Sequence, residues 1–281
     1  MVRQKLGQHF LTDARWRDEI AQAAGIPRPF VKSSASLTEN RCWIEIGAGH
    51  GEMTEYLAAT RLPVYAIELD RTLIPGLERL AQKFSNLKIL HEDVLEADVE
   101  EISVGRRVSI YGNLPYYITS PILHRLFRFA GLIDTLSIVI QAEVAQRLTA
   151  QPGTSAYGYL SVAAQLYSVP SFIFEIPAGA FSPPPEVSSA LVILNFSAAQ
   201  RRESLGLEGD ENDFLEFVKV CFAQKRKTLV NNLRSLAEPV VVRQALESQS
   251  LRTDARAEKL TIGNFATLYE RLGRNRTAAP R

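Results

Sequence analysis

Two shortages in this sequence narrow the class of protein before any motif is considered. Only two of its 281 residues are cysteines, Cys42 and Cys221, and their wide separation indicates neither a disulfide framework nor a zinc site. No uninterrupted apolar run reaches the roughly 20 residues that cross a bilayer. The charged first 20 residues also lack the apolar segment of a secretory signal. We therefore expect a metal-free, cytoplasmic protein that has no membrane segment.

Net charge is also small, but its distribution is uneven. The formal net charge is +1, yet residues 219–281 contain 13 Lys or Arg and only 5 Asp or Glu. Residues 1–218 contain the other 19 basic and 26 acidic residues. A basic C-terminal portion on an acidic body indicates a polyanionic partner at that end. A solvated helical surface is an equally good interpretation of the charge alone.

Apolar strands alternate with amphipathic helices between residues 41 and 148. The expected strands are 41–49, 62–70, 87–94, 106–114 and the first part of 135–148. The expected helices are 52–60, 71–84, 120–131 and the second part of 135–148. This alternation predicts an α/β fold with a mostly parallel, Rossmann-like sheet that has helices on both faces.

The rest of the chain predicts two closing strands and a smaller helical domain. Apolar runs flank the proline-rich stretch "SPPPEVS" at 171–181 and 189–196. The polar stretch 197–213 is a candidate linker. Helical periodicity returns in 214–238 and 257–274. We thus expect a catalytic domain over 1–200 and a small all-helical domain over 201–281.

A glycine-rich turn follows the first expected strand of this α/β pattern. In "WIEIGAGHGEMT", Gly47 and Gly49 would let the backbone turn sharply and approach a ligand closely. The dinucleotide fingerprint G-x-G-x-x-G would require glycine at position 52, which is Glu52 here, and no P-loop lysine follows. Pyrophosphate binding is therefore disfavoured, and the turn alone does not identify a ligand.

Acidic residues at the ends of the next two strands indicate a cofactor that contains a nucleoside. Glu68 ends the strand after the glycine turn, where a carboxylate can accept hydrogen bonds from ribose hydroxyls. Asp93 ends the following strand, where it could accept a hydrogen bond from an adenine amino group. A helix cap at Glu68 and an Asx turn at Asp93 are the structural alternatives. Because ligands bind at such strand ends in parallel sheets, the combination favours a cofactor site.

The sequence resembles a known family over about residues 5–272. The stretches "EIGAGHGEMT", "AIELD", "HEDVLEAD" and "YGNLPYYITSPIL" occur in the order typical of class I S-adenosylmethionine-dependent methyltransferases. Together with "LGQHFL", "FSPPPEVSSALV" and "FAQKRKTLVNNL", they resemble the KsgA-type ribosomal RNA adenine dimethyltransferases. The resemblance implies S-adenosylmethionine as methyl donor, with no metal. It implies cofactor contacts from His9, Leu11, Gly47, Gly49, Glu68, Asp93 and Asn113. Many family members have Asn at the position of His9.

The segment "NLPYY" follows the fourth expected strand and can be read chemically. The side-chain oxygen of Asn113 and the backbone carbonyl of Leu114 can each accept one hydrogen of an adenine amino group. Pro115 restricts Leu114 to extended geometry, and Tyr116 offers a face for the extruded base. A turn with half-buried tyrosines is the structural alternative. We expect Tyr117 to lie in the core.

The resemblance also indicates residues that contact the substrate. It implies that Phe181 flanks the target base from the other side, whereas Glu186 stands where the family often has a basic residue. A basic helical face would contact phosphates through Lys225, Arg226, Lys227 and Arg234.

The implied substrate is two adjacent adenosines near the 3′ end of small-subunit ribosomal RNA, each dimethylated in an assembling small subunit by a monomeric enzyme. Three other functions remain open: a large-subunit RNA methyltransferase of the antibiotic-resistance type, a DNA adenine methyltransferase, and a non-catalytic RNA-binding or assembly factor.

Overall fold

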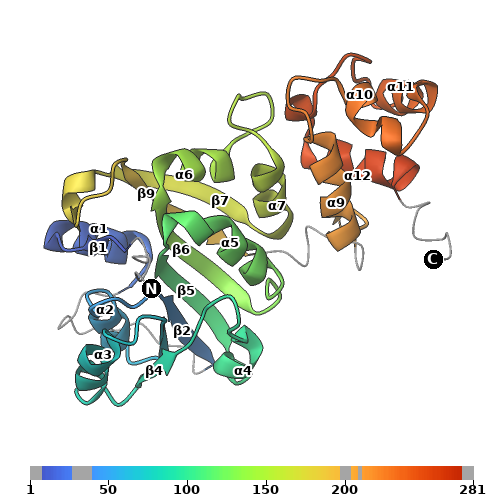
Figure 1. The fold of residues 1–281 in the computed structure, drawn as a ribbon. Coiled ribbons are helices and arrows are strands. Elements are labelled where there is room, and N and C mark those ends of the chain that lie inside the picture. Colours follow the sequence, from blue (N-terminus) through green and yellow to red (C-terminus); the bar gives the residue numbers. More distant parts are fainter. Residues whose placement is uncertain (1–7, 27–39, 197–203, 208–210, 274–281) are drawn as a thin grey trace, which may run out of the picture. The chain divides into compact units, whose positions relative to one another are not determined.

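The chain forms two compact units in a computed structural model, which describes residues 8–26, 40–196, 204–207 and 211–273 (Figure 1). One unit comprises residues 1–145 and 170–196, and the other comprises residues 146–169 and 197–281. The sequence-based boundary after residue 200 assigned all of 146–169 to the first domain. In the structure, that segment groups with the helical residues that follow in sequence.

A seven-stranded sheet forms the centre of the first unit, with strand order β4-β3-β2-β5-β6-β9-β7. Its strands are β2 (Arg41–Ile46), β3 (Val64–Glu68), β4 (Leu87–His91), β5 (Arg107–Asn113), β6 (Ile133–Gln141), β7 (Val169–Ile176) and β9 (Ser189–Asn195). The pairs among β2, β3, β4, β5 and β6 are parallel, whereas β9 runs antiparallel to β6. The predicted mostly parallel sheet is confirmed.

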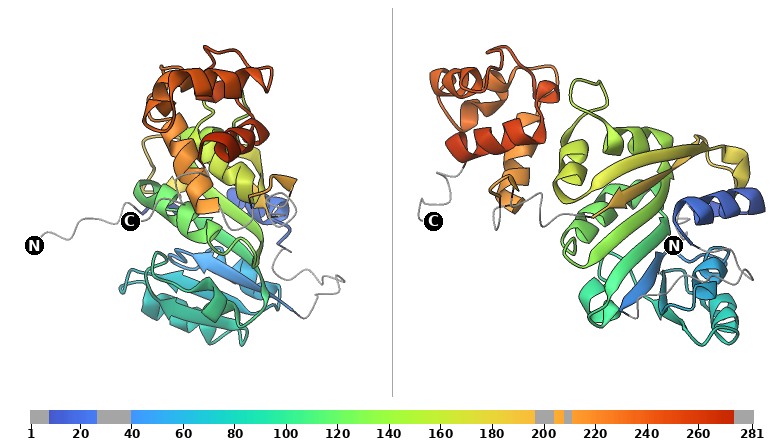
Figure 2. Two further views of the ribbon diagram at one scale, coloured as in Figure 1. Left: turned by 90° about the vertical axis from the view of Figure 1, so that its right-hand side faces the viewer. Right: turned by 180° about the vertical axis from the view of Figure 1, so that it is seen from behind.

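Helices cover both faces of this sheet, as Figures 1 and 2 show. They are α1 (Ala14–Ala23), α2 (Thr54–Ala59), α3 (Ile74–Ala81), α4 (Val99–Ser103), α5 (Thr119–Phe127) and α6 (Ala142–Thr149). Strand order runs outward from β2 through β3 to β4 and then returns to β5 on the other side of β2. Right-handed crossovers in these two directions place α2 and α3 on one face and α4 and α5 on the other.

A small second sheet ties the N-terminal segment to the proline-rich loop. Its strands β1 (Phe10–Leu11) and β8 (Phe181–Ser182) pair antiparallel, with Leu11 opposite Phe181. The backbone N–H of Thr12 also donates to the carbonyl of Ala180 at 3.0 Å. Leu11 and Phe181 are both buried, so this pairing anchors the N-terminal segment on the first unit.

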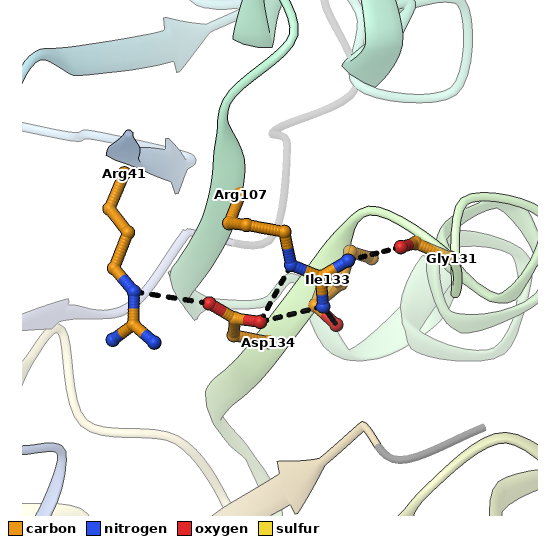
Figure 3. A network of polar contacts seen from close by, with 5 residues as sticks. All are labelled: Arg41, Arg107, Gly131, Ile133 and Asp134. Atoms are coloured by element: carbon orange, nitrogen blue, oxygen red, sulfur yellow. Dashed lines mark hydrogen bonds and ion pairs between the residues drawn. The ribbon is translucent and has the colours of Figure 1, made fainter. Parts of the chain in front are cut away.

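At the amino ends of the central strands, charged side chains bond mainly to one another (Figure 3). Arg107, the first residue of β5, donates from Nε and Nη2 to Asp134 Oδ1 on β6, at 2.8 and 2.6 Å. The same guanidinium donates to the carbonyls of Gly131 and Ile133. Arg41, at the start of β2, completes the group with an ion pair of 3.4 Å to Asp134 Oδ2. The network therefore links the beginnings of three neighbouring strands.

The second unit is helical. Its elements are α7 (Tyr159–Tyr167), α9 (Glu211–Cys221), α10 (Leu229–Asn232), the 3₁₀ turn η3 (Leu233–Ser235), α11 (Pro239–Glu247), the 3₁₀ turn η4 (Ala257–Lys259) and α12 (Ile262–Leu272). Aromatic rings meet in its interior, with Phe214 and Tyr269 edge to face at 5.8 Å. Across the described residues, no helix is long and apolar enough to span a bilayer.

Residues 214–238, which have helical periodicity, are not helical in their middle part. Helix α9 ends at Cys221, and turns occupy the segment up to Thr228 before α10 begins. Asn232 Nδ2, from α10, donates to the carbonyl of Cys221 at 2.7 Å and to that of Gln224 at 3.3 Å. These bonds satisfy carbonyls that the next helical turn would otherwise use.

Candidate active site

The carboxyl ends of β2, β3, β4 and β5 surround a cavity of the first unit. Its empty space is about 790 Å³, part of it open to solvent, which suits a nucleoside-sized ligand. Nine of the predicted site residues line it: His9, Gly47, Gly49, Glu68, Asp93, Asn113, Leu114, Pro115 and Tyr116. The cavity lies where strand order reverses between β2 and β5, the position at which open α/β sheets bind ligands.

The glycine turn after β2 requires residues that have no side chain. Gly47 and Gly49 have φ angles of +71° and +61°, in the left-handed region that disfavours other residues. A Cβ on Gly49 would also approach the ring of Phe10 to 3.1 Å. The turn directs the N–H of Gly49 toward the end of β3, where it donates to Glu68.

Glu68 presents a carboxylate that is already held in place by the backbone. Its side chain is 4% exposed. Oε2 accepts the N–H of Gly49 and Oε1 accepts the N–H of Asp70, both at 2.8 Å. Because each carboxylate oxygen can accept more than one hydrogen bond, both retain capacity for a ligand diol.

Asp93 makes the turn that was its structural alternative and lines the cavity as well. Its Oδ1 accepts the N–H of Leu95 at 2.9 Å, in an Asx turn. The same residue is only partly buried and faces the cavity beside Val94. This turn fixes the carboxylate at the end of β4, so the structural and ligand-binding interpretations are compatible.

Asn113 has a defined orientation. Its Nδ2 donates to the backbone carbonyl of His9 at 2.8 Å, across a sequence separation of 104 residues. A carbonyl partner requires the nitrogen on that side, so Oδ1 points elsewhere as an acceptor. The next residue, Leu114, is anchored by its N–H to the carbonyl of Val139 at 3.0 Å.

Tyr116 and His9 form one wall of the cavity. The hydroxyls of Tyr116 and Ser189 lie 2.6 Å apart, and burial raises the pKa of Tyr116, partly offset by that hydrogen bond. The imidazole of His9 stacks on the phenol ring, with centroids 5.6 Å apart and planes inclined by 27°. His9 Nδ1 donates to the carbonyl of Pro183 at 2.8 Å, so the wall is fixed at both ends.

Comparison with known proteins shows the family of this chain. Residues 1–274 match the family model described as ribosomal RNA adenine dimethylase. The chain belongs to this family. It is 38% identical to ribosomal RNA small subunit methyltransferase A of Koribacter versatilis, over 95% of this chain and 93% of that protein. The protein of the same name from Staphylococcus epidermidis is also 38% identical, over 95% and 89%.

Solved structures support the fold. The crystal structure of a dimethyladenosine transferase from Plasmodium falciparum has a TM-score of 0.75 at 23% identity, covering 93% of this chain and 96% of that one. The 23S rRNA methyltransferase ErmE has a TM-score of 0.67 at 24% identity, covering 94% and 99%. Both likenesses extend over nearly the whole chain and show that it shares their fold.

A dimethylase of this family uses S-adenosylmethionine, and the cavity fits such a cofactor. The donor set contains two carboxylates at successive strand ends, suited to a ribose diol and an amino group. Apolar side chains between them suit an adenine ring: Ile67, Leu69, Val94, Ile118 and Ile122. Within the described ranges, no three His, Cys, Asp or Glu side chains are placed to hold a metal ion.

Two predicted site residues of this dimethylase lie outside the main cavity. Leu11 borders a smaller neighbouring cavity that also touches Gly47, Gly49 and Asn113. Phe181 is 3% exposed and packs in the core beneath the small sheet. Of the two aromatic walls expected around a target base, the cavity therefore has only Tyr116.

The expectation that Tyr117 lies in the core is wrong. Its side chain is 62% exposed and lines the cavity. Tyr116 and Tyr117 are consecutive in the 3₁₀ turn η1 (Tyr116–Ile118), where successive side chains point about 120° apart. Only one of the two rings can therefore turn inward, and Tyr116 is held there by Ser189.

Sequence reasoning missed Glu45, which lies beneath the glycine turn on β2. It is 2% exposed, and its Oε2 has no hydrogen-bond partner among the described residues. The pKa of Glu45 is raised to about 8, mainly by burial and also by the charges of Glu52 and Glu68, against an interaction with the Thr54 hydroxyl that lowers it. A single acidic residue within the apolar run "WIEI" was the available signal.

The predicted RNA-binding residues belong to the helical unit and are all exposed. Lys225, Arg226 and Lys227 lie in the turn after α9, and Arg234 lies in η3. These four residues therefore do not form the face of a single helix that the sequence predicts. Lys225 Nζ donates to the carbonyl of Ser155. The basic cluster is therefore a surface turn packed against the loop before α7.

Proposed function

We propose that this protein transfers methyl groups from S-adenosylmethionine to the N6 atoms of two adjacent adenosines near the 3′ end of small-subunit ribosomal RNA. Each adenosine would receive two methyl groups within an assembling small subunit. The proposal rests above all on Asn113, which lines the cavity and whose Nδ2 is engaged by the His9 carbonyl, so that Oδ1 is left as the acceptor. The named relatives act on the same subunit according to their descriptions.

The acceptor pair addresses the weak nucleophilicity of an adenine amino group. Its lone pair is delocalised into the ring, so the nitrogen is planar and unreactive. Asn113 Oδ1 and the Leu114 carbonyl would each accept one amino hydrogen, which favours a pyramidal nitrogen whose lone pair is free to attack. The cofactor supplies an electrophilic methyl group on a sulfonium. Correct alignment of such reactants can contribute about 7–11 kcal/mol.

The cofactor would be held by Glu68 and Asp93, with the glycine turn close to its methionine portion. No strong general base is required at the outset, because the methylated nitrogen carries the proton until it is released. We propose no metal in this reaction. Tyr116 would stack on the extruded base, and its hydrogen bond to Ser189 keeps the ring from rotating away.

RNA binding is assigned to the helical unit, with chemistry in the sheet unit. The exposed Lys225, Arg226, Lys227 and Arg234 would neutralise phosphates, and such contacts weaken as salt rises. We propose a monomeric enzyme that works in the cytoplasm, where its substrate assembles. Phe181 would support the base pocket from within the core rather than line it.

The test is incubation of the purified protein with labelled S-adenosylmethionine and undermethylated small or large ribosomal subunits, followed by mapping of the modified bases. We expect label on two adjacent adenosines of the small subunit. Label confined to the large subunit would instead support the antibiotic-resistance type of activity. Label only in DNA, or none in any substrate, would refute the proposal.

A further inference from the structure

Tyr117 is an exposed aromatic residue at the mouth of the cavity. Its side chain is 62% exposed, which is high for a tyrosine that also lines a ligand cavity. Leu69, another lining residue, is 46% exposed. Both side chains therefore leave apolar surface toward solvent beside the cavity that would hold the cofactor and target base. Such surface at a site often marks where a ligand binds.

The charges of the cavity make aromatic contact more important there. Among the described residues that line it, none is Lys or Arg, whereas Glu68, Glu92 and Asp93 are acidic. A polynucleotide at this mouth would gain no phosphate neutralisation from these lining residues. Contacts that carry no charge are therefore what these lining residues can offer to the RNA. Base–aromatic stacking is the available interaction of that kind.

The backbone separates the two tyrosines into two surfaces. Tyr116 is fixed inside by Ser189 and bears the imidazole of His9, whereas Tyr117 projects about 120° away in the same 3₁₀ turn. One extruded base cannot contact both rings in the same way. A base that neighbours an extruded base has lost a stacking partner, so a second aromatic surface would replace that partner.

We propose that Tyr117 is a second base-stacking site, which binds the nucleotide adjacent to the target adenosine. This inference rests on the proposed function and names a part of the substrate that the other residues do not address. It divides RNA recognition in two. Lys225, Arg226 and Lys227 provide charge-dependent affinity, and Tyr117 provides charge-independent affinity next to the reacting base.

The test compares Tyr117→Ala with Tyr117→Phe in the full-length protein. The probes are undermethylated small subunits and a single-stranded RNA oligonucleotide that contains two adjacent adenosines. Loss of one stacking contact should raise the Kd for both probes about 5- to 100-fold, while Tyr117→Phe stays within about twofold. The control is Phe172→Ala, because Phe172 is an exposed aromatic on β7 that does not line the cavity.

Salt dependence and cofactor affinity separate this role from others. In Tyr117→Ala, log K against log salt should shift without a change in slope, whereas charge reversal at Lys225, Arg226 and Lys227 should flatten the slope. S-Adenosylmethionine affinity should be unchanged. An equal loss of cofactor affinity would place Tyr117 on the cofactor and overturn the inference.

A loss seen with intact subunits but not with the oligonucleotide would indicate contact with a ribosomal protein, and also overturns it. If the wild-type protein methylates the small subunit and Tyr117→Ala binds RNA as the wild type does, this inference is refuted but the proposed function is not. Absence of methyl transfer by the wild-type protein refutes the proposed function instead.

Discussion

The two ends of the central sheet treat polar side chains in opposite ways. At the amino ends, Arg107 donates two hydrogen bonds to Asp134 Oδ1 and two more to the carbonyls of Gly131 and Ile133. At the carboxyl ends, Glu68 and Asn113 each use part of their hydrogen-bonding capacity for the backbone. A polar group that lines a cavity and keeps hydrogen-bonding capacity can act on a ligand, whereas one engaged with an oppositely charged side chain outside the cavity stabilises the fold.

The largest effect is expected at Asn113. Replacement by Ala removes the proposed acceptor, so kcat should fall about 10²- to 10³-fold, while RNA affinity stays within about twofold. The measurement is steady-state methyl transfer together with RNA binding. Asn113→Asp keeps an oxygen but loses the N–H that holds the His9 carbonyl, so it separates acceptor from positioning. A kcat near that of the wild type in Asn113→Ala would show that Asn113 is not the acceptor in methyl transfer, and would contradict the contrast between the two ends of the sheet.

Glu45, on β2 beneath the glycine turn, should make the free energy of unfolding depend measurably on pH. An unfolded glutamate ionises near pH 4.5, whereas the folded Glu45 has a pKa of about 8 because it is buried. Between these values the unfolded state binds fewer protons, so the free energy of unfolding falls by about 1.4 kcal/mol per pH unit. Stability from this group is complete below about pH 4.5 and is lost as pH rises through about 8.

Urea unfolding at pH 5.5 and 7.5 tests this dependence. Glu45→Gln has no ionisation there, so it should lose about 3 kcal/mol less than the wild type between the two pH values. The exposed Glu143→Gln is the control and should behave like the wild type. Equal pH dependence in all three proteins would show that Glu45 ionises normally in the folded state.

Glu68 should affect cofactor binding by an intermediate amount. Glu68→Gln replaces one accepting oxygen with a donor that faces the N–H of Gly49 or Asp70, so S-adenosylmethionine affinity should drop about 10- to 100-fold. Calorimetric titration measures it. Glu92→Gln is a matched control in the same cavity and should stay within about twofold. If both variants bind the cofactor equally well, Glu68 does not hold the cofactor and the contrast between the two ends of the sheet does not extend to this residue.

The smallest effect is expected at the amino ends. Asp134→Asn weakens the pairing with Arg107, and because both groups are partly exposed the free energy of unfolding should drop by only about 1 kcal/mol. Methyl transfer at saturating substrate should not change. A fall in kcat without a matching loss of stability would mean that the network is coupled to the active site, contrary to the contrast drawn between the two ends.

Local patterns predicted the sheet and the strand-end residues because both depend on neighbouring positions. Glu68, Asp93 and Asn113 each end an apolar run, and parallel strands bring such ends to one edge. The pairing of His9 with Asn113, across 104 positions, leaves no local signal, and only the family resemblance indicated His9. The prediction that Tyr117 lies in the core was wrong because the direction of its side chain is set by the 3₁₀ turn η1.

Contacts between distant residues also account for the errors in the C-terminal part. Residues 214–238 as a whole carry a helical period, but α9 ends at Cys221, and the carbonyls of Cys221 and Gln224 accept hydrogen bonds from the amide of Asn232. Helix α7 carries eight buried residues of nine, so it has no amphipathic period to reveal it. Its partners α9 and α12 follow only after residue 210.

The grouping of residues 146–169 with the helical unit determines how this protein can be dissected. A protein truncated after residue 196 would keep α7 but lose the helices that bury Leu160 through Tyr167. The loop before α7 would also lose the N–H bond from Gly153 to the carbonyl of Glu258, of 2.7 Å. Such a fragment would expose apolar side chains of α7 that are buried in the full chain, and we expect it to aggregate. Separate expression of the sheet unit therefore requires removal of 146–169 and a short connection in its place.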